Sequence, residues 1–268
     1  MKKLIPVVMI LALACGVATA SETVQNFRIS AMGMADVGLA DDDAAFLSNP
    51  AGIPHMKVYG PRISPWPSRV SGTFSVGGDI DTFSAFYSAR NAAGTQGWGA
   101  GYWNLDAGKS TDVDGFGAGY GMEFSGGLSG GVSLLHTTNA SDHTMVNLGG
   151  MYRVDAPMSD WSYGALLRDL TDESGSGPML DLGASVTLPS GLLITAELED
   201  ISDEIDTVFN VGAEWPMPMT AFTLRGGAAD GDLTLGVGYM LTSWEVGLTW
   251  MDSDGGDDQW LIGAAGSF

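Results

Sequence analysis

From Arg69 to the end of the chain, apolar and polar residues alternate in segments of about nine to eleven residues. In the segment Met179 to Leu188, leucine, alanine and valine fill every second position, and Asp181 lies between them. The next segment, Gly191 to Glu199, repeats the pattern with Glu197 on its polar side. A period of two is that of a β-strand, and the length suits a strand that crosses a bilayer at a tilt. Two such neighbours predict a lipid-facing wall around a polar lumen.

The same pattern predicts an all-β fold, a transmembrane antiparallel β-barrel of about fourteen strands, in residues 69–268. The expected strands are 69–76, 80–89, 97–105, 113–122, 127–136, 144–154, 161–170, 179–188, 191–199, 207–215, 220–227, 233–241, 244–251 and 259–268. The proline-rich stretch 55–68 is interpreted as a linker, because proline is disfavoured in central strands. A different assignment there would change the count by two.

The connections and the tryptophans give this barrel a direction. Connections after even-numbered strands are tight or contain proline, whereas most of those after odd-numbered strands contain clusters of Asp and Glu. Short periplasmic turns and polar external loops are typical of outer-membrane barrels. Trp98, Trp161, Trp215 and Trp244 fall at the expected periplasmic ends, while Trp250 and Trp260 fall at the external ends. This placement matches the aromatic girdles at the two membrane interfaces.

The amino terminus has the three zones of a secretory signal peptide in residues 1–20: Lys2 and Lys3, an apolar run, and small residues up to Ala20. Lipoprotein processing at Cys15 is the alternative, although Ala12 stands where a lipobox has leucine. No other stretch has the roughly 18 to 20 consecutive apolar residues of a membrane helix. Without the two lysines the chain has nine basic against 32 acidic residues, so nucleic acid is excluded as a partner.

Residues 31–53, AMGMADVGLADDDAAFLSNPAGI, combine a small-Met-Gly start, an Ala-Asp-Asp centre and Asn-Pro-Ala-Gly. In this order the elements resemble the N-terminal signature of the FadL-type outer-membrane channels and their smaller PorV-like relatives. The resemblance implies a plug inside the barrel, here residues 21–54. The matching plug or gate residues are Gly33, Asp41, Asp42, Asn49, Pro50, Ala51 and Gly52. An ordinary helix start capped by the aspartates is the alternative, and in either case Pro50 ends the helix at Asn49.

Charged residues on the expected inner face form the second candidate site. They are Arg153, Arg168, Asp181, Glu197, Glu214, Arg225 and Glu245. They are expected to pair with one another, and Arg153, Arg168 or Arg225 is expected to hold the aspartates at 41–43. Two roles remain open: an ion-pair lattice that stiffens the barrel, or contact with a polar substrate head. Apolar residues share this face, which favours a path for amphiphiles over a water-filled pore: Phe86, Trp103, Leu135, Met151, Leu166, Leu193 and Met251.

The sequence contains no catalytic constellation, so neither an enzyme nor a cofactor is expected. The glycines at 115, 117, 119 and 121 alternate with larger residues, which favours a strand with a thin inner face over a phosphate loop. Asp252, Asp254, Asp257 and Asp258 are a weak candidate for a Ca²⁺ site, and the alternative is a solvated acidic loop.

These observations predict a plugged barrel of the bacterial outer membrane. By the resemblance, it takes up hydrophobic or amphipathic small molecules. A PorV-like accessory for exported proteins and a purely structural envelope barrel are the alternatives. The expected partners are outer-membrane lipid, a hydrophobic small molecule and, for the accessory, exported proteins. The terminal segment with Gly263 and Phe268 also resembles the signal read by the barrel-assembly machinery, although Gly266 replaces a usual hydrophobic residue.

Overall fold

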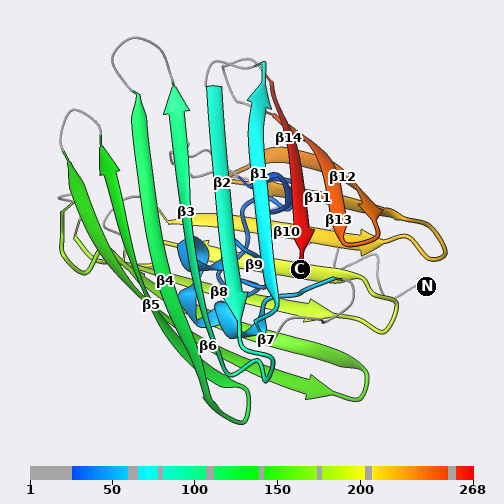
Figure 1. Cartoon of the computed structure of the whole chain (residues 1–268), viewed down its shortest axis with the longest axis horizontal. Helices are drawn as coiled ribbons and strands as arrows, with labels where there is room; N and C mark the ends of the chain where they lie inside the picture. The colour runs from blue at the N-terminus through cyan, green and yellow to red at the C-terminus, as the bar shows by residue number, and fades with distance from the viewer. Residues whose placement is uncertain are drawn as a thin grey trace.

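The chain forms one closed antiparallel barrel of fourteen strands (Figure 1). A computed structural model describes residues 26–59, 66–77, 81–106, 112–138, 142–173, 177–202, 207–252 and 258–268. The strands are β1 (Ser68–Val76), β2 (Asp81–Arg90), β3 (Gln96–Asp106), β4 (Val113–Ser125), β5 (Leu128–Thr138), β6 (His143–Ala156), β7 (Ser159–Arg168), β8 (Met179–Thr187), β9 (Leu193–Glu199), β10 (Val208–Pro216), β11 (Phe222–Ala229), β12 (Asp232–Leu241), β13 (Trp244–Met251) and β14 (Gln259–Ser267). The expected fold is confirmed, and no strand end differs from its expected position by more than three residues.

Each strand pairs with its sequence neighbours, and β1 pairs with β14 to close the ring. At this seam the backbone N–H of Ser68 donates to the carbonyl of Phe268 at 3.1 Å, and the return bond is 2.9 Å. Side chains alternate between the two faces as the sequence pattern requires. In β13, for example, Glu245 is buried on the inside while Trp244 and Val246 are exposed outside.

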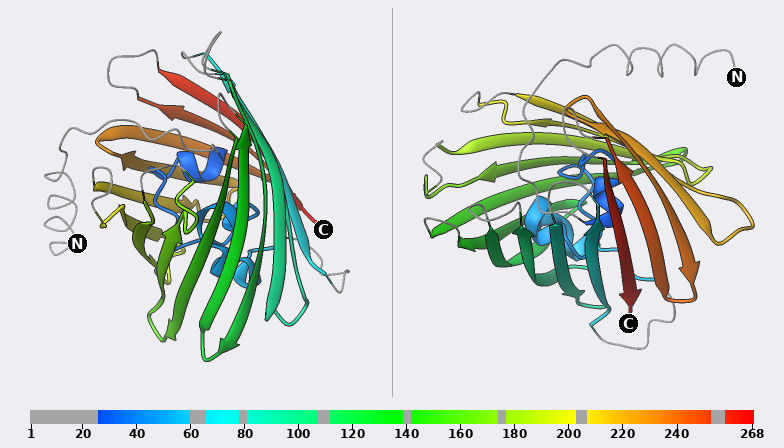
Figure 2. Two further views of the ribbon diagram at one scale, coloured as in Figure 1. Left: turned by 90° about the vertical axis from the view of Figure 1, so that its left-hand side faces the viewer. Right: turned by 90° about the horizontal axis from the view of Figure 1, so that it is seen from above.

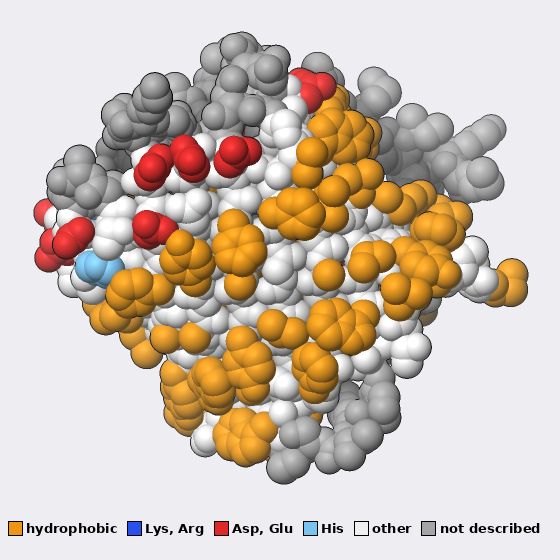
Figure 3. Space-filling model, turned by 45° about the horizontal axis from the view of Figure 1, so that its top comes forward, with side chains coloured by type: hydrophobic (Ala, Val, Ile, Leu, Met, Phe, Trp, Pro, Cys, Tyr) orange, Lys and Arg blue, Asp and Glu red, His pale blue; other side chains and the backbone are white. Residues whose placement is uncertain are grey.

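The outside of the barrel is apolar between its two ends. Hydrophobic side chains cover the face drawn in Figure 3, and Asp and Glu side chains gather along one rim of it. Leu182, Leu198 and Leu235 are among the exposed wall residues. Such a surface is costly in water and favourable in contact with lipid tails.

We call the two ends of the barrel the turn end and the loop end. The turn end holds the first residue of β1, Phe268 and six short turns: 91–95, 126–127, 157–158, 188–192, 217–221 and 242–243. The loop end holds the other seven connections: 77–80, 107–112, 139–142, 169–178, 200–207, 230–231 and 252–258.

Three short helical elements lie inside the barrel (Figure 2). They are α2 (Phe27–Ser30), α3 (Ala45–Ser48) and the 3₁₀ helix η1 (Pro50–His55). α3 ends where expected: Asn49 is extended, with φ −161°, because the residue before a proline is disfavoured in the helical region. η1 runs one residue past the expected plug boundary at 54. No helix in the described ranges is long and apolar enough to span a membrane.

Candidate functional site

Residues 26–57, here called the lumen segment, lie within the barrel and are almost fully buried; Met32, Asp43, Asn49 and Ile53 are each 0 % exposed. Hydrogen bonds join the backbone of this segment to strands around the ring. Phe27 N donates to Thr73 Oγ1 (3.2 Å), Gly33 N to Thr234 Oγ1 (3.1 Å), Ser185 Oγ to Gly38 O (3.1 Å), Thr195 Oγ1 to Ala35 O (2.8 Å) and Thr249 Oγ1 to Phe27 O (2.6 Å). The wall therefore supplies hydrogen-bond partners to buried backbone groups of the segment.

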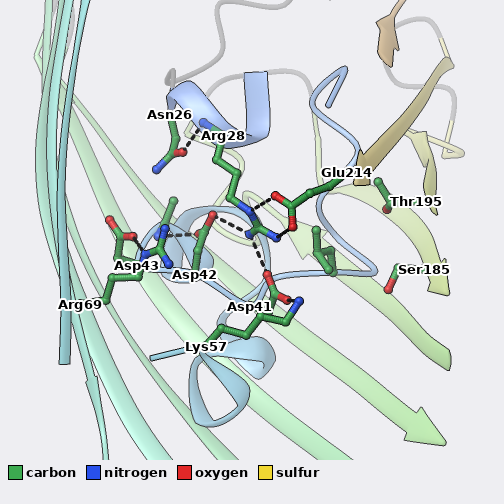
Figure 4. Close-up of polar contacts among 12 residues, drawn as sticks. Asn26, Arg28, Asp41, Asp42, Asp43, Lys57, Arg69, Ser185, Thr195 and Glu214 are labelled. Atoms are coloured by element: carbon green, nitrogen blue, oxygen red, sulfur yellow. Dashed lines mark hydrogen bonds and ion pairs between the residues drawn. The ribbon is translucent and has the colours of Figure 1, made fainter. Parts of the chain in front are cut away.

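Arg28 is the centre of an ion-pair lattice (Figure 4). Its guanidinium lies 2.7 Å from Asp41, 3.3 Å from Asp42 and 2.8 Å from Glu214 of β10. Lys57 approaches the second oxygen of Asp41 at 2.5 Å. Arg28 thus links two turns of the lumen segment to each other and to the wall.

The lattice continues to the seam of the barrel. Arg69 of β1 pairs with Asp43 at 2.8 Å and lies 3.8 Å from Glu245 of β13. Arg225 of β11 contacts Glu245 and lies 2.8 Å from Glu214. Charges of both signs therefore alternate across the lumen. Buried ions are tolerated in such an arrangement because each one has partners of opposite charge.

The partners of the aspartates at 41–43 were predicted wrongly. Arg153, Arg168 and Arg225 do not pair with these aspartates in the described structure. Their partners are Arg28 and Lys57 of the lumen segment and Arg69 of β1. Arg153 Nη2 instead donates to the backbone carbonyl of Leu39 at 3.0 Å. The alternation correctly pointed these arginines inward, but it contains no information on which lumen residue lies opposite.

A second charged group lies toward the loop end. Arg168 pairs with Asp181 at 2.6 Å and with Glu199 at 2.9 Å. Glu197 is buried beside them, and its carboxylate accepts the backbone N–H groups of Asp36 and the following residue, both at 2.8 Å. These wall carboxylates therefore fix the backbone of the lumen segment as well as balancing one arginine.

Asn49 joins the two helical elements to the wall. Its Oδ1 accepts the N–H of Ala51 at 3.1 Å and so caps η1, which begins at Pro50. Its Nδ2 donates to Val37 O at 3.0 Å and to Gly150 O of β6 at 3.2 Å. The Asn-Pro pair of the sequence thus ends one helix, starts the next and fixes both to the barrel.

The glycines of the signature lie where backbones meet. Gly33 has φ +63°, and a Cβ there would lie about 2.5 Å from backbone atoms of Ala228. At Gly52 a Cβ would lie 2.0 Å from the carbonyl oxygen of Ala40. Ala51 is completely buried in the core around Phe46. Only residues without a side chain fit at these two glycine positions.

The wall also has glycines where its inner face meets the lumen segment. A Cβ at Gly121 would lie 2.2 Å from the carbonyl of Pro50, and one at Gly119 would lie 2.9 Å from Phe46. The expected thin inner face of β4 is therefore filled by the lumen segment. Phe86, Trp103, Leu135 and Met151 form one core with Phe46, so this apolar lumen surface is packed rather than open.

The remaining expected sites are outside the lumen lattice. Of the acidic loop proposed as a cation site, Asp252 and Asp258 are described, whereas Asp254 and Asp257 lie outside the described residues. Among the residues that the structure places, no group of three or more His, Cys, Asp or Glu side chains is arranged to hold a metal ion. The expected signal peptide likewise lies outside the described ranges.

Burial and neighbouring charge shift the pKa values of the aspartates in opposite directions. Burial favours the protonated form of Asp41, but Arg28 and Lys57 outweigh it and hold the pKa well below its usual range. Asp42 has less compensation, so burial, opposed by Arg28, raises its pKa to about 6. Adjacent carboxylates thus differ in charge below about pH 6.

Sequence reasoning missed three members of the lattice: Arg28, Lys57 and Arg69. The signal was present in the composition, because nine basic residues remain when Lys2 and Lys3 are set aside, against 32 acidic ones. Because acidic residues outnumber basic ones more than three to one, each buried basic residue is expected to pair with a carboxylate.

Comparisons with solved structures find barrels of similar fold. The CymD monoaromatic hydrocarbon channel superposes with a TM-score of 0.60 at 11% identity, over 91% of this chain and 98% of that one. The toluene transporter TbuX of Ralstonia pickettii gives 0.60 at 13% identity, over 91% and 97%. The toluene transporter TodX of Pseudomonas putida gives 0.56 at 12% identity, over 91% and 98%. These identities show a shared fold alone. No protein-family model matches the sequence, and no curated protein matches it.

Proposed function

We propose that this protein is a FadL-type channel of the bacterial outer membrane that takes up hydrophobic or amphipathic small molecules. The observation that carries the proposal is a group of partly exposed apolar side chains that borders the packed core inside the closed barrel. Met34, Leu47 and Met145 are partly exposed and pack against the core formed by the lumen segment and the wall. Met145 is the third residue of β6, near the loop end, so part of this apolar surface lies toward the expected outside. Two of these three side chains are methionines, which adapt to ligands of different shape.

The lumen segment is the proposed plug and gate. It fills the barrel at the level of Asn49, and a fourteen-strand barrel without contents would be wide enough to conduct water and ions. A ligand bound against Leu47 would lie directly above this segment. Passage then requires the segment to rearrange, and no covalent step is needed.

The charge at the loop end disfavours anionic ligands. Nine of the described residues in its seven connections are Asp or Glu, and among the described residues there none is Lys or Arg. A surface of one sign repels ligands of the same sign and lowers their local concentration. We therefore propose a neutral hydrophobic molecule as substrate, in preference to a fatty-acid anion. The hydrocarbon and toluene named for the structurally similar channels are molecules of this neutral kind.

An uptake assay tests the proposal. Toluene accumulation is compared in Gram-negative cells that express the protein and in cells that carry an empty vector. Expression should accelerate uptake, and Leu47→Gln should reduce the effect. The same change at Leu170, exposed at the loop end, is the matched control and should have no effect. Equal uptake with and without the protein would contradict the proposed activity.

Planar bilayers test the gate separately. A chain lacking residues 30–52 should conduct ions more strongly than the intact protein, because the deletion removes most of the buried lumen segment. Equal conductance from a folded deletion variant would show that this segment does not close the pore.

No observation on the described structure favours the alternatives of an accessory for exported proteins or a structural barrel.

A further inference from the structure

The lumen segment is not held in the barrel in the same way along its whole length. The ion-pair lattice around Arg28 and the packed core around Phe46 hold the parts on either side of residues 34–40. Residues 34–40, here called the gate loop, contain one charged residue, Asp36, and no ion pair among the described residues includes it. The gate loop therefore lies outside the lattice.

Hydrogen bonds from one side of the wall hold the gate loop. All of them are made to backbone groups of the loop, at 2.8 to 3.1 Å. Figure 4 shows two of the wall residues, Ser185 and Thr195, apart from the lattice around Arg28. Loss of these bonds, and of the one from Asn49 to Val37 O, would release the loop and leave the lattice in place. The wall residues are Arg153 of β6, Ser185 of β8, and Thr195 and Glu197 of β9.

The backbone is strained at both ends of the gate loop. Met34 has φ +59° and Ala40 has φ +35°, a region in which a Cβ atom crowds the neighbouring carbonyl. The other six non-glycine residues with positive φ in the described structure lie in connections between strands. Strain of this kind persists where the surroundings hold it in place, and it is common in segments that switch. A change of backbone angles at Met34 and Ala40 would relieve the strain and move the loop.

The gate loop lies directly against β7 and β8. A Cβ at Gly164 of β7 would lie 2.0 Å from Val37 O, and one at Gly183 of β8 would lie 2.3 Å from Gly38 N. The wall has no side chain at either position, so the loop itself occupies the space there. Movement of the loop away from these two glycines would open a path along the inside of the wall.

This path would join the two ends of the lumen. Met34 belongs to the partly exposed apolar group that carries the proposed function. Leu39, near the other end of the gate loop, packs against Leu193, the first residue of β9 after the turn 188–192 at the turn end. The loop thus extends from the ligand side of the lumen to the turn end.

We propose that the gate loop is the part of the lumen segment that moves, with hinges at Met34 and Ala40, and that a neutral hydrophobic ligand triggers the movement through contact with Met34. A ligand shifts such an equilibrium only if it binds the open arrangement better. The open arrangement offers it the apolar surfaces of Leu39 and Leu193, which pack against each other in the closed one. The inference rests on the proposed function, and it adds which residues move and which residue senses the ligand.

Thiol labelling tests the movement in a chain whose own cysteine, Cys15, has been replaced. Ala35→Cys places a thiol in the gate loop, and Ala51→Cys is the matched control in η1; the two alanines are 1 % and 0 % exposed. A small water-soluble maleimide is added to the protein in phosphatidylcholine vesicles, with and without saturating toluene, and the labelled fraction is followed by mass spectrometry. Toluene should accelerate labelling at 35 several-fold and leave labelling at 51 unchanged. Leu39→Cys and Ile53→Cys form a second pair if a variant of the first pair does not fold.

The role of Met34 is tested in the Ala35→Cys background. Met34→Ala removes the ligand contact and should abolish the effect of toluene on labelling. Met145→Ala removes a wall residue of the same apolar group. It should raise the toluene concentration required but retain the full acceleration at saturation.

A cross-link tests whether uptake needs the movement. Leu39→Cys with Leu193→Cys, joined by a short bifunctional thiol reagent, ties the gate loop to β9. The control joins His55→Cys to Ser129→Cys, whose native side chains lie 3.2 Å apart between η1 and β5. In the cellular toluene assay, the first cross-link should stop uptake and the second should leave it intact, and reduction should restore the first.

The other outcomes separate the possible failures. Equal acceleration of labelling at 35 and 51 would show that the whole segment moves, which overturns the gate loop. Uptake that continues with the 39–193 cross-link in place overturns it as well. Loss of the toluene effect in both methionine variants at saturation would remove Met34 as the particular sensor. If the intact protein takes up no toluene in cells, the proposed function itself fails, and the ligand-triggered movement fails with it.

Discussion

Adjacent glycines on β6 offer a direct test of how closely the wall fits the lumen segment. A Cβ at Gly149 would lie 2.1 Å from Asn49 Oδ1 and 3.1 Å from Ala51 N, whereas a Cβ at Gly150 would meet nothing within 4 Å. Asn49 is 0 % exposed, so it cannot move aside without disturbing its hydrogen bonds to Ala51 and Val37. Overpacking and the loss of one such bond together predict a cost of about 2 to 4 kcal/mol for Gly149→Ala.

Gly150→Ala is the matched control. It should leave the free energy of unfolding within about 1 kcal/mol of the original or raise it, because alanine reduces the freedom of the unfolded chain. Both variants are measured by urea unfolding in lipid vesicles, followed by tryptophan fluorescence. Equal effects of the two substitutions would refute the close fit between β6 and Asn49.

Three further predictions concern charge. Arg28→Met should lower the free energy of unfolding by about 3 to 5 kcal/mol because it leaves buried carboxylates unpaired. Lys57→Met removes a cation whose side chain is 41% exposed and should cost about 0 to 1 kcal/mol. Equal losses in the urea assay would contradict the central role of Arg28. The raised pKa of Asp42, about 6, lies above its unfolded value, so its stabilising contribution is complete at low pH and is lost as pH rises through 6. Lowering the pH from about 7 to about 5 should therefore stabilise the protein relative to Asp42→Asn, by about 1 kcal/mol, and a constant difference would exclude this titration. Leu235→Arg should lower the free energy of unfolding by about 2 to 4 kcal/mol, and Leu233→Arg, nearer the loop end, by about 0 to 1 kcal/mol. Equal losses would show that Leu235 does not face the middle of the bilayer.

The strands could be predicted because lipid imposes a simple rule on every residue of the wall. The pattern around Leu182 and Leu198 fixes which face is outside, and with it the register of neighbouring strands. The ends were less certain: β4 runs to Ser125, three residues beyond its expected end, since a strand can continue past the apolar belt without breaking the rule.

The contacts across the lumen could not be predicted in the same way. Alternation shows that Arg153 and Arg225 point inward, but the residue opposite each one depends on the path of the lumen segment. The apolar inner residues illustrate the same limit. Trp103 and Leu135 were interpreted as the surface of a ligand path, and the structure uses them to pack Phe46. Direction follows from a local pattern, whereas a partner follows from the whole fold.

Phe27 also constrains the order in which this barrel can be assembled. Its N–H donates to Thr73 of β1, its carbonyl accepts from Thr249 of β13, and its ring fills the space above Gly263 of β14. These strands come from opposite ends of the chain and meet only when the seam forms, which is the step with the largest loop-closure cost. We therefore expect the amino-terminal residues to be enclosed before β1 and β14 join. After that, the segment can leave the lumen only through an end of the barrel, and it must first break its hydrogen bonds to the wall.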